Sequence, residues 1–362
     1  MSILVINPGS TSTKLALFKG GEVAASEELQ HDRFELAGFE RVADQFDFRM
    51  QVITGFLHKA GADTAEIRAV AGRGGLLRPL QGGVYEVSDD MVDDLKTARY
   101  GEHPCNLGAG LALALARQWG VPAYVVDPAV TDELMDTARL TGLPGLERRS
   151  LFHALNQRGV ARIVAKQLGL SYDSANFIIC HMGGGITIGA HLRGRVVDVV
   201  NGLDGEGPFT PERTGALPVV PVLDMIRSGE RSVDELRLAV MKQGGLVAHL
   251  GTNDLRQVEA RIQAGDAQAE RVFRAMAYTV ARYAASMAPA LVDGDGLLNV
   301  AAVILTGGLA RSEQLVAEVT RMVRHLGPVH VVPGEVEMLA LATGAQRALS
   351  GAEQVRAYRG DG

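Results

Sequence analysis

The sequence is poor in cysteine and aromatic residues, and it carries no excess of positive charge. Its two cysteines, Cys105 and Cys180, lie far apart in the chain, so they form neither a metal-ligand pattern nor a disulfide framework. Free thiols are typical of a reducing compartment, and a cytoplasmic location is therefore expected. The formal net charge of −6 disfavours nucleic acid and anionic membranes as partners, because both attract basic surfaces.

Long apolar segments are also missing. The chain enters an apolar pattern at residues 1–6 without the basic region and the small-residue cleavage site of a signal peptide. The longest apolar stretch, residues 107–116, ends at Arg117 and is too short to cross a bilayer. We therefore expect no membrane partner.

The common cofactor and metal signatures are absent from the sequence. It contains no G-x-x-x-x-G-K-[ST], no strand-linked G-x-G-x-x-G, no H-E-x-x-H, no C-x-x-C and none of the protein-kinase motifs. The informative features of the sequence are its length and its many glycines. Its 362 residues indicate about two domains, and many of its 43 glycines adjoin apolar runs, as in tight turns beside a ligand. An ATP site, if present, has to be built from such turns.

Two small, polar turns each follow an apolar strand pattern, at residues 3–6 and 177–180. We call Asn7–Lys14 the first turn and His181–Gly185 the second turn. Matching positions around them are separated by a constant 174 residues: Asn7 and His181, Gly9 and Gly183, Ala16 and Ala190, Gly20 and Gly194. A separation that persists through two turns indicates a duplicated domain.

Strand and helix patterns alternate along the rest of the chain. Strands are expected at residues 123–126, 300–305 and 329–332, and helices at 89–97, 107–119, 150–168, 233–243, 254–264, 267–291 and 337–349. This alternation predicts an α/β fold with two related lobes and a cleft between them. The first lobe is expected to span 1–126 with 340–362, and the second 127–339. Residues from Gly351 onward are expected to be frayed.

Both turns have the composition of a phosphate-binding site. Their small side chains leave backbone N–H groups accessible, and hydroxyl groups add further donors for the oxygens of a polyphosphate. For one turn alone, an ordinary hairpin with glycine at positive φ would be the better explanation of the composition. Two equivalent turns, with Thr306-Gly307-Gly308 at a third strand end, favour the phosphate interpretation.

In their order along the chain, four motifs resemble those of the acetate kinase family, and in particular its butyrate-phosphorylating members. The family belongs to the wider group that includes actin, hexokinase and Hsp70-type ATPases. The motifs are Ile6–Lys14, the second turn, Asp204–Gly215 and Leu305–Ala310, and the similarity runs from Ser2 to about Leu349. The resemblance implies two duplicated actin-like (ribonuclease H-like) domains with an interdomain active-site cleft. It also implies ATP and ADP as nucleotides, Mg²⁺ as the metal, and a homodimer or larger homo-oligomer.

The implied reaction is direct, in-line transfer of the γ-phosphoryl group of ATP to a small carboxylic acid. A carboxylate is already ionised at pH 7, so it needs no general base. The difficulty is to bring two anions together and to stabilise the transferring group, which favours arginine. Arg73 and Arg213 match the family's two active-site arginines. Solvated surface arginines are the alternative, but Arg73 stands among glycines after an apolar strand, where surface charge is unusual.

The resemblance assigns roles to further residues. His181 would form a hydrogen bond to the phosphoryl group in flight, and Asp127 would orient the reactants and a Mg²⁺-linked water. Glu337 and Asn7 are the expected metal residues, with Glu335 as an alternative to Glu337. Nucleotide contacts are expected from Asn7, Ser10, Ser12, Lys14, Gly183, Gly184, Gly185, Gly307 and Gly308, and substrate contacts from Arg73, Gly75, His103 and Asn106. Lys14 could equally face outward, Asn106 could cap a helix, and His153, Asn156 and Asn201 are weaker candidates.

The expected substrate is butanoate, converted reversibly with ATP to butanoyl phosphate and ADP. Acetate kinases have bulky residues after the active-site arginine, whereas this chain has Gly74-Gly75, which is expected to leave room for a longer acyl chain. Acetate, propionate or a branched acid is the alternative substrate. A non-catalytic, ATP-gated binding protein of the same fold is the alternative function.

Overall fold

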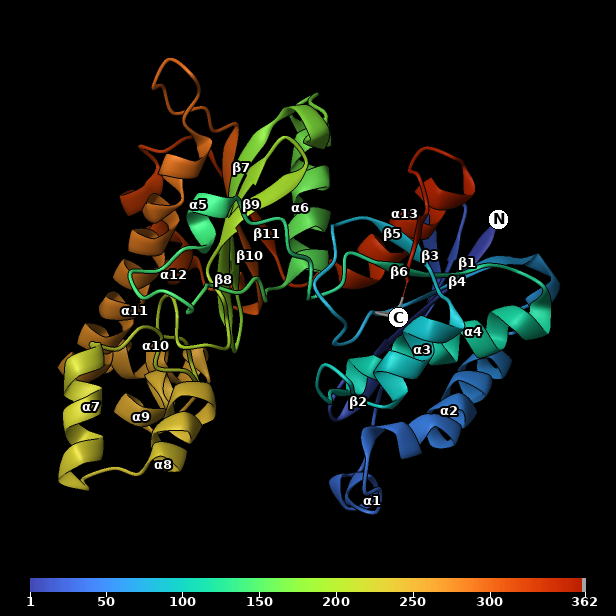
Figure 1. The fold of residues 1–362 in the computed structure, drawn as a ribbon, viewed down its shortest axis with the longest axis horizontal. Coiled ribbons are helices and arrows are strands. Elements are labelled where there is room, and N and C mark those ends of the chain that lie inside the picture. The colour runs from blue at the N-terminus through green and yellow to red at the C-terminus, as the bar shows by residue number, and fades with distance from the viewer. Residues whose placement is uncertain (360–362) are drawn as a thin grey trace. The chain divides into compact units, whose positions relative to one another are not determined.

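The computed structural model describes residues 1–359, which form two compact units (Figure 1). Unit 1 contains Met1–Thr131, Ala154–Gly159 and the chain from Val336 onward, and unit 2 contains Asp132–His153 and Val160–Glu335. The division therefore runs through helix α6 (Ala154–Gln167). The lobe boundaries given by the sequence, 1–126 with 340–362 and 127–339, stay predictions, and residues 360–362 lie outside the described residues.

Unit 1 is built on a mixed sheet of seven strands, in the order β12-β5-β6-β4-β1-β2-β3. Strand β1 is antiparallel to β2 and parallel to β4, and every residue of β1 is buried. A strand covered on both faces needs apolar side chains at successive positions, which the run Ile3-Leu4-Val5-Ile6 supplies. The strands are β1 (Ser2–Pro8), β2 (Ser12–Lys19), β3 (Glu22–Gln30), β4 (Ile67–Gly72), β5 (Val84–Glu86), β6 (Ala123–Val126) and β12 (Arg356–Ala357).

Helices cover both faces of this sheet (Figure 1). Successive residues of a strand point to opposite faces, and α13 (Glu337–Leu349) packs Leu341 and Ala345 against the face that carries Ile3 and Val5. Helix α4 (Leu107–Trp119) contacts β4 and β6 from the other face. The remaining helices of unit 1 are α1 (Arg33–Ala37), α2 (Phe46–Lys59) and α3 (Asp89–Lys96).

Unit 2 repeats the central part of this sheet. Its five strands lie in the order β11-β10-β7-β8-β9, which matches β6-β4-β1-β2-β3 of unit 1. The pairings agree in direction as well, because in both orders two parallel pairs are followed by two antiparallel pairs. The predicted duplication and α/β fold class are therefore confirmed. The strands are β7 (Asn176–Met182), β8 (Ile186–Leu192), β9 (Arg195–Val199), β10 (Ala302–Gly307) and β11 (Val329–Pro333).

The strand register corrects the predicted constant separation of the two copies. Asn7 pairs with Lys14 across the first turn, and His181 pairs with Thr187 across the second, so the separations are seven and six residues. The offset of 174 therefore applies before the turn and becomes 173 after it. A register shift after Leu17 in β2 and after Ala190 in β8 supports the offset of 173. Glycine-rich composition had hidden the one-residue difference in turn length.

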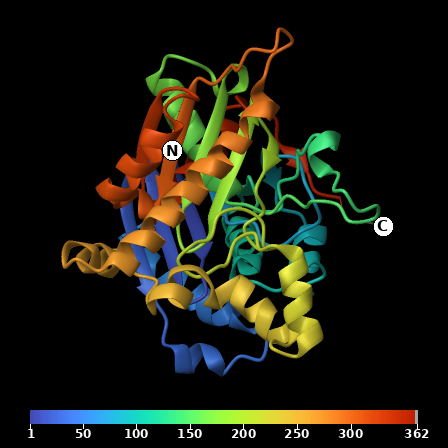
Figure 2. The same ribbon diagram turned by 90° about the vertical axis from the view of Figure 1, so that its left-hand side faces the viewer.

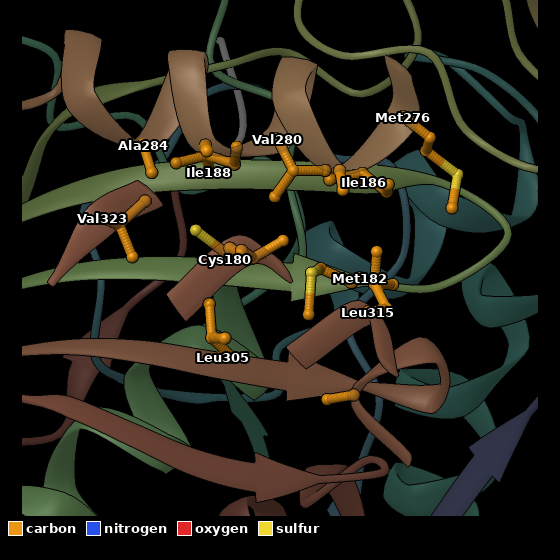
Figure 3. Packing of buried hydrophobic residues seen from close by; sticks show 14 of the residues in the cluster. Cys180, Met182, Ile186, Ile188, Met276, Val280, Ala284, Leu305, Leu315 and Val323 are labelled. Carbon is orange, nitrogen blue, oxygen red and sulfur yellow. The ribbon is translucent and has the colours of Figure 1, made fainter. Parts of the chain in front are cut away.

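The core of unit 2 lies between its sheet and two long helices. Figure 2 shows α11 (Ala267–Ser286), in orange, lying across the sheet, and α12 (Glu313–Val323) packs beside it. In Figure 3, side chains from α11 and α12 meet those of β7, β8 and β10: Cys180, Met182, Ile186, Ile188, Met276, Val280, Ala284, Leu305, Leu315 and Val323. The other helices are α5 (Asp136–Arg139), α7 (Val219–Ser228), α8 (Val233–Leu238), α9 (Gly245–Leu250) and α10 (Leu255–Gln263). Across residues 1–359, no helix has the length and apolarity needed to span a bilayer.

Residues 356–358 are more ordered than the sequence indicates. Residues after Gly351 were expected to be frayed, but β12 pairs in parallel with β5. Tyr358 is buried, and its hydroxyl group donates a hydrogen bond to Asp94 Oδ2 over 2.6 Å. A strand of two residues and a single buried tyrosine produce no periodic pattern, so the sequence could not indicate this structure.

Candidate active site

Three predicted site residues of unit 1 meet where β1 and β4 end and α13 begins. Asn7 Nδ2 donates to Glu337 Oε2 over 2.9 Å, and Arg73 Nη1 donates to the same oxygen over 2.7 Å. Arg73 Nη1 also lies 3.2 Å from Asn7 Oδ1. Asn7 and Glu337 are buried, so this ion pair is largely shielded from water. Glu337 is thus the glutamate held by Asn7 and Arg73, whereas Glu335 belongs to unit 2.

The position of Arg73 follows from close packing behind it. Its backbone N–H donates to Ile6 O over 2.9 Å, which continues the pairing of β4 with β1. A Cβ atom on Gly72 would collide with Gly108 O, and one on Gly108 would collide with Arg73 O. Two glycines therefore let α4 approach the end of β4 and fix where the arginine leaves the sheet.

Predicted substrate residue His103 lies within the field of Arg73. Its Nδ1 accepts from the Cys105 N–H over 3.2 Å and lies 2.9 Å from Cys105 Sγ. Withdrawal of the imidazole ring from water lowers the pKa of His103, and the positive charge of Arg73 lowers it further. Burial raises the pKa of Cys105 to about 11. Both side chains are therefore uncharged near pH 7.

Gly74 and Gly75 do not open space for an acyl chain, contrary to the expectation from the sequence. A Cβ atom on Gly74 would lie 2.5 Å from Val125 Cγ1, and one on Gly75 would collide with Asn106 and lie 2.7 Å from Leu95 Cδ2. Neighbouring side chains already fill the positions where larger residues would project. The glycines instead allow the segment after Arg73 to pack closely.

The side chain of Asn106 connects three backbone segments by hydrogen bonds. Its Oδ1 accepts from the Leu76 N–H over 2.9 Å, and its Nδ2 donates to Gly101 O over 2.9 Å and to Leu95 O over 3.3 Å. These bonds occupy one acceptor and both donors of the amide. A role in holding the segment after Arg73 follows from this geometry, and its predicted contact with substrate stays a prediction.

Asp127 is part of a buried ion pair. The carboxylate is 1% exposed, Arg158 Nε lies 2.8 Å from Oδ1, and the Gly83 N–H donates to the same oxygen over 2.8 Å. A Cβ atom on Gly82 would lie 2.5 Å from Arg158 Nη1, so a glycine is needed there. Asp127 also has a φ of 40°, which is unusual for a residue with a side chain. This carboxylate holds α6 to the loop after β6, and its predicted catalytic role remains a prediction.

In unit 2, two imidazole rings lie together at the second turn. The rings of His153 and His181 stack with centroids 3.8 Å apart and planes 15° apart. His153 Nδ1 lies 2.9 Å from Thr187 Oγ1, on the strand paired with His181. His181 is 2% exposed. His153, a weaker candidate in the sequence, therefore belongs structurally to the same cluster as His181.

Arg213 lies against the second turn. A Cβ atom on Gly185 would collide with its guanidinium group, so glycine at this position makes room for the arginine. Arg213 Nη1 donates to Gly202 O over 2.5 Å, and its buried Nε has no hydrogen-bond partner in the described structure. No carboxylate of residues 1–359 forms an ion pair with Arg213. Burial lowers its pKa, and the negative charge of Glu212 opposes this shift.

Thr210 connects the loop that carries Arg213 to the second turn, a role the sequence did not reveal. Its hydroxyl group donates to Gly184 O over 2.6 Å and accepts from the Arg213 N–H over 3.0 Å. The residue is 2% exposed. Its place inside the motif Asp204–Gly215 is the signal that could have indicated it.

The third glycine pair lies at the end of β10. Gly307 has a φ of 90°, and a Cβ atom there would collide with Met182 O, so glycine is required. Gly308 has open space where a Cβ atom would be. It borders a cavity of about 410 Å³ in unit 2, lined by Asn253, Asp254, Leu255, Arg256, Glu259, Gly308, Leu309, Arg311 and Ser312.

The remaining predicted residues divide between surface and structure. Ser10 is exposed, Lys14 is half-buried in β2, and Ser12 Oγ donates to Glu28 Oε1 over 3.1 Å. The weaker candidates Asn156 and Asn201 bind backbone groups: Asn156 Oδ1 accepts from the Val336 N–H over 2.8 Å, and Asn201 Oδ1 accepts from the Leu203 N–H over 2.8 Å. The bond from Asn156 fixes the residue before Glu337.

The chain is similar over its whole length to curated kinases. The sequence profile of the Acetokinase family matches residues 144–348. A protein of Maridesulfovibrio salexigens named probable butyrate kinase is 48% identical over 99% of this chain and 99% of its own. Another of that name, from Enterococcus faecalis, is 48% identical over 99% of this chain and 97% of its own.

Solved structures agree in fold. Porphyromonas gingivalis acetate kinase has a TM-score of 0.77 at 20% identity, covering 96% of this chain and 99% of its own. A propionate kinase from Francisella tularensis has a TM-score of 0.70 at 20% identity, covering 95% and 98%. The duplicated sheets, the glycine turns and these likenesses define a phosphotransferase of the actin-like fold with a carboxyl group as acceptor. The chain belongs to the acetate kinase family, as its motifs predicted.

Proposed function

We propose that this protein is a short-chain fatty acid kinase that converts ATP and butanoate reversibly to butanoyl phosphate and ADP. Support for butanoate comes from the relatives named probable butyrate kinase, which match almost the full chain at 48% identity. We further propose that it acts in the cytoplasm as a homodimer or larger homo-oligomer. Acetate, propionate or a branched acid is the alternative acceptor, since the kinase fold is shared by acetate and propionate kinases.

Arg213 is the observation that carries this proposal. It is a half-buried guanidinium group with no carboxylate partner in residues 1–359, and its Nε is buried without a hydrogen bond. A buried donor without a partner is costly, and an anionic oxygen would satisfy it. Its contact with Gly185 puts this donor at the turn expected to bind phosphate.

The transfer itself needs few covalent steps. A carboxylate oxygen of butanoate attacks the γ-phosphorus, the bond from that phosphorus to the β,γ-bridging oxygen breaks, and ADP leaves with the bond electrons. No proton has to be removed from the acceptor at pH 7. Arg213 and Arg73 would balance the charge of the transferring group and of the carboxylate, and His181 would donate a hydrogen bond to the phosphoryl group.

The nucleotide would be held by the glycine turns. Ser10, Ser12 and Lys14 of the first turn and Gly183, Gly184 and Gly185 of the second turn would contact the polyphosphate. The cavity beside Gly308 has the size of a small-molecule site and would take the adenosine. Gly307 shapes its edge through the turn at the end of β10.

The residues present fit a Mg²⁺ site completed by the nucleotide. In residues 1–359 no cluster of three or more His, Cys, Asp or Glu side chains could hold a metal on its own. Mg²⁺ is commonly bound through one or two protein oxygens plus phosphate oxygens. Glu337 Oε2 accepts from Asn7 and Arg73, so Glu337 Oε1 and Asn7 Oδ1 are the protein oxygens that would hold the ion. When bound, the ion would neutralise part of the polyphosphate charge.

Replacement of Arg213 tests the proposal. Arg213→Ala should lower kcat for butanoyl phosphate formation by at least about 100-fold, the loss typical of one removed transition-state donor. ADP binding and the unfolding temperature should change little, because the side chain is tied to the fold through a single carbonyl. Arg237→Ala, at an exposed arginine of α8, is the matched control and should retain normal turnover. Near-normal turnover of Arg213→Ala would remove this arginine from the mechanism.

A further inference from the structure

Helix α2 carries a guanidinium group beneath the first turn that the proposed function does not use. Arg49 is fully buried. Its Nη2 donates to Gly9 O over 2.8 Å, and its Nη1 donates to Ser12 O and Thr13 Oγ1 over 2.9 Å each. Gln45 Oε1 accepts from Arg49 Nε over 3.1 Å and from Nη2 over 2.9 Å. One arginine thus holds both sides of the turn.

Every acceptor of Arg49 is electrically neutral. No carboxylate in residues 1–359 forms an ion pair with it, and burial lowers its pKa to about 10. Burial lowers the pKa of His31, whose Nε2 lies 2.8 Å from Thr13 Oγ1, and the charge of Arg49 lowers it further. A charge buried without a counter-charge destabilises the folded protein. Its presence beneath a turn that is expected to bind an anion therefore calls for an explanation.

The arginine also sets the polarity of the turn. The carbonyl oxygens of Gly9 and Ser12 accept from Arg49, and Thr11 O accepts from the His31 N–H over 2.8 Å. The N–H groups of Ser10 and Thr11, both exposed, donate no hydrogen bond within the described residues. Carbonyl groups therefore face the interior, and N–H groups are available at the surface. Adjacent backbone N–H groups that are not bonded within the fold can bind an anion.

We propose that Arg49 is a positioning residue for the nucleotide. It holds the first turn in its anion-binding form, and the polyphosphate of ADP or ATP supplies the counter-charge that the folded protein lacks. At low effective dielectric, a charge one turn of backbone away still interacts with the anion. This inference rests on the proposed function, because it assumes that the first turn contacts the polyphosphate.

Gln45 allows a direct test, because its oxygen already accepts two bonds from Arg49. Gln45→Glu keeps both bonds and supplies the missing carboxylate. The unfolding temperature without ligand should rise, and the dissociation constant for ADP, measured by calorimetry, should increase about tenfold. Affinity for adenosine, which has no phosphate, should stay within about twofold. Gln51→Glu places the same charge on the exposed side of α2 and should change neither affinity.

A folded Gln45→Glu protein with wild-type ADP affinity would overturn the inference. Should that variant not fold, Arg49→Lys provides the second test. It retains the charge but loses the fork that binds two carbonyl groups, so ADP should bind at least about threefold more weakly while adenosine binds normally. Equal ADP affinity there would likewise contradict the inference. The two proposals can be rejected separately. If the wild type is an active kinase and Gln45→Glu binds ADP normally, the role of Arg49 is rejected. If the wild type has no kinase activity and Gln45→Glu weakens ADP binding as expected, the proposed kinase function is rejected.

Discussion

Four shielded arginines of this chain differ in how their charge is balanced. Arg73 and Arg158 form ion pairs with Glu337 and Asp127 over 2.7 and 2.8 Å. Arg213 and Arg49 donate to neutral groups in the described residues. An ion pair has its counter-charge within the fold, whereas an unpaired guanidinium group gains stability when an anion binds. Arg213 and Arg49, which lack such an ion pair within residues 1–359, are therefore the arginines that we expect to stabilise bound anions.

The motifs singled out Arg73 and Arg213, whose catalytic roles stay predictions, but they did not indicate which residues contact and position the two arginines. Arg49 acts on a turn more than thirty residues earlier, and no local pattern marks that contact. For Gly74 and Gly75, the sequence led instead to a wrong prediction, namely that they leave room for an acyl chain. A missing side chain in the sequence does not reveal that Asn106 and Leu95 fill the space.

His31 should make the stability of the protein depend on pH. Burial lowers the pKa of His31, and Arg49 lowers it further. Below the ordinary value of about 6.5 the unfolded chain binds a proton that the folded chain resists, so stability is lost as pH falls. The unfolding temperature should therefore decrease between pH 7.5 and 5.5. His31→Gln cannot take up a proton and should show a shallower decrease.

His325→Gln, at an exposed position of unit 2, is the control for that experiment and should follow the wild type. Some slope should persist in His31→Gln because the pKa of His103 is also lowered. Identical slopes for wild type and His31→Gln would show that His31 titrates normally in the folded state.

Among the elements, strongly patterned segments were predicted well. The strands at 3–6 and 177–180 and the helices at 107–119 and 337–349 agree with β1, β7, α4 and α13 because each has a clear apolar period. Helices α2 and α7 were not predicted. In α7 no residue is buried, so its apolar residues do not mark a face packed on the unit's core. Turn length was misjudged because glycines can be aligned with more than one neighbour.

Thr210 joins two elements of the candidate site, the second turn and the loop that carries Arg213. Thr210→Val removes the hydroxyl group at nearly constant volume. It should destabilise the protein by about 1–3 kcal/mol, because Gly184 O and the Arg213 N–H lose a buried partner. It should also reduce kcat at least about tenfold, since the loop would no longer hold Arg213 against Gly185.

Thr210→Ser retains the hydroxyl group and is the matched control for this prediction. Denaturant unfolding and steady-state kinetics with butanoate would compare the two variants. Equal turnover in Thr210→Val and Thr210→Ser would show that the hydrogen bond to the second turn does not support catalysis.

At the scale of the whole molecule, duplication has produced two related hairpins with different chemistry. The first turn carries hydroxyl groups and Asn7, and the second carries glycines and His181. In unit 1, Asn7, Arg73 and Glu337 contact one another, and in unit 2, His181 and Arg213 both lie at the second turn. The motif order was sufficient to predict the fold and the class of reaction. The motif order could not predict which acid is preferred, because one methylene group changes specificity by only about 10- to 200-fold.

The most direct measurement is acyl hydroxamate formation by the purified protein with ATP, Mg²⁺ and straight-chain acids from acetate to hexanoate. We expect product with several acids and the highest kcat/KM with butanoate. A maximum at acetate would identify an acetate kinase and reject the proposed substrate. Absence of product with every acid, from folded protein that binds ADP, would contradict the central claim that this chain phosphorylates carboxylates.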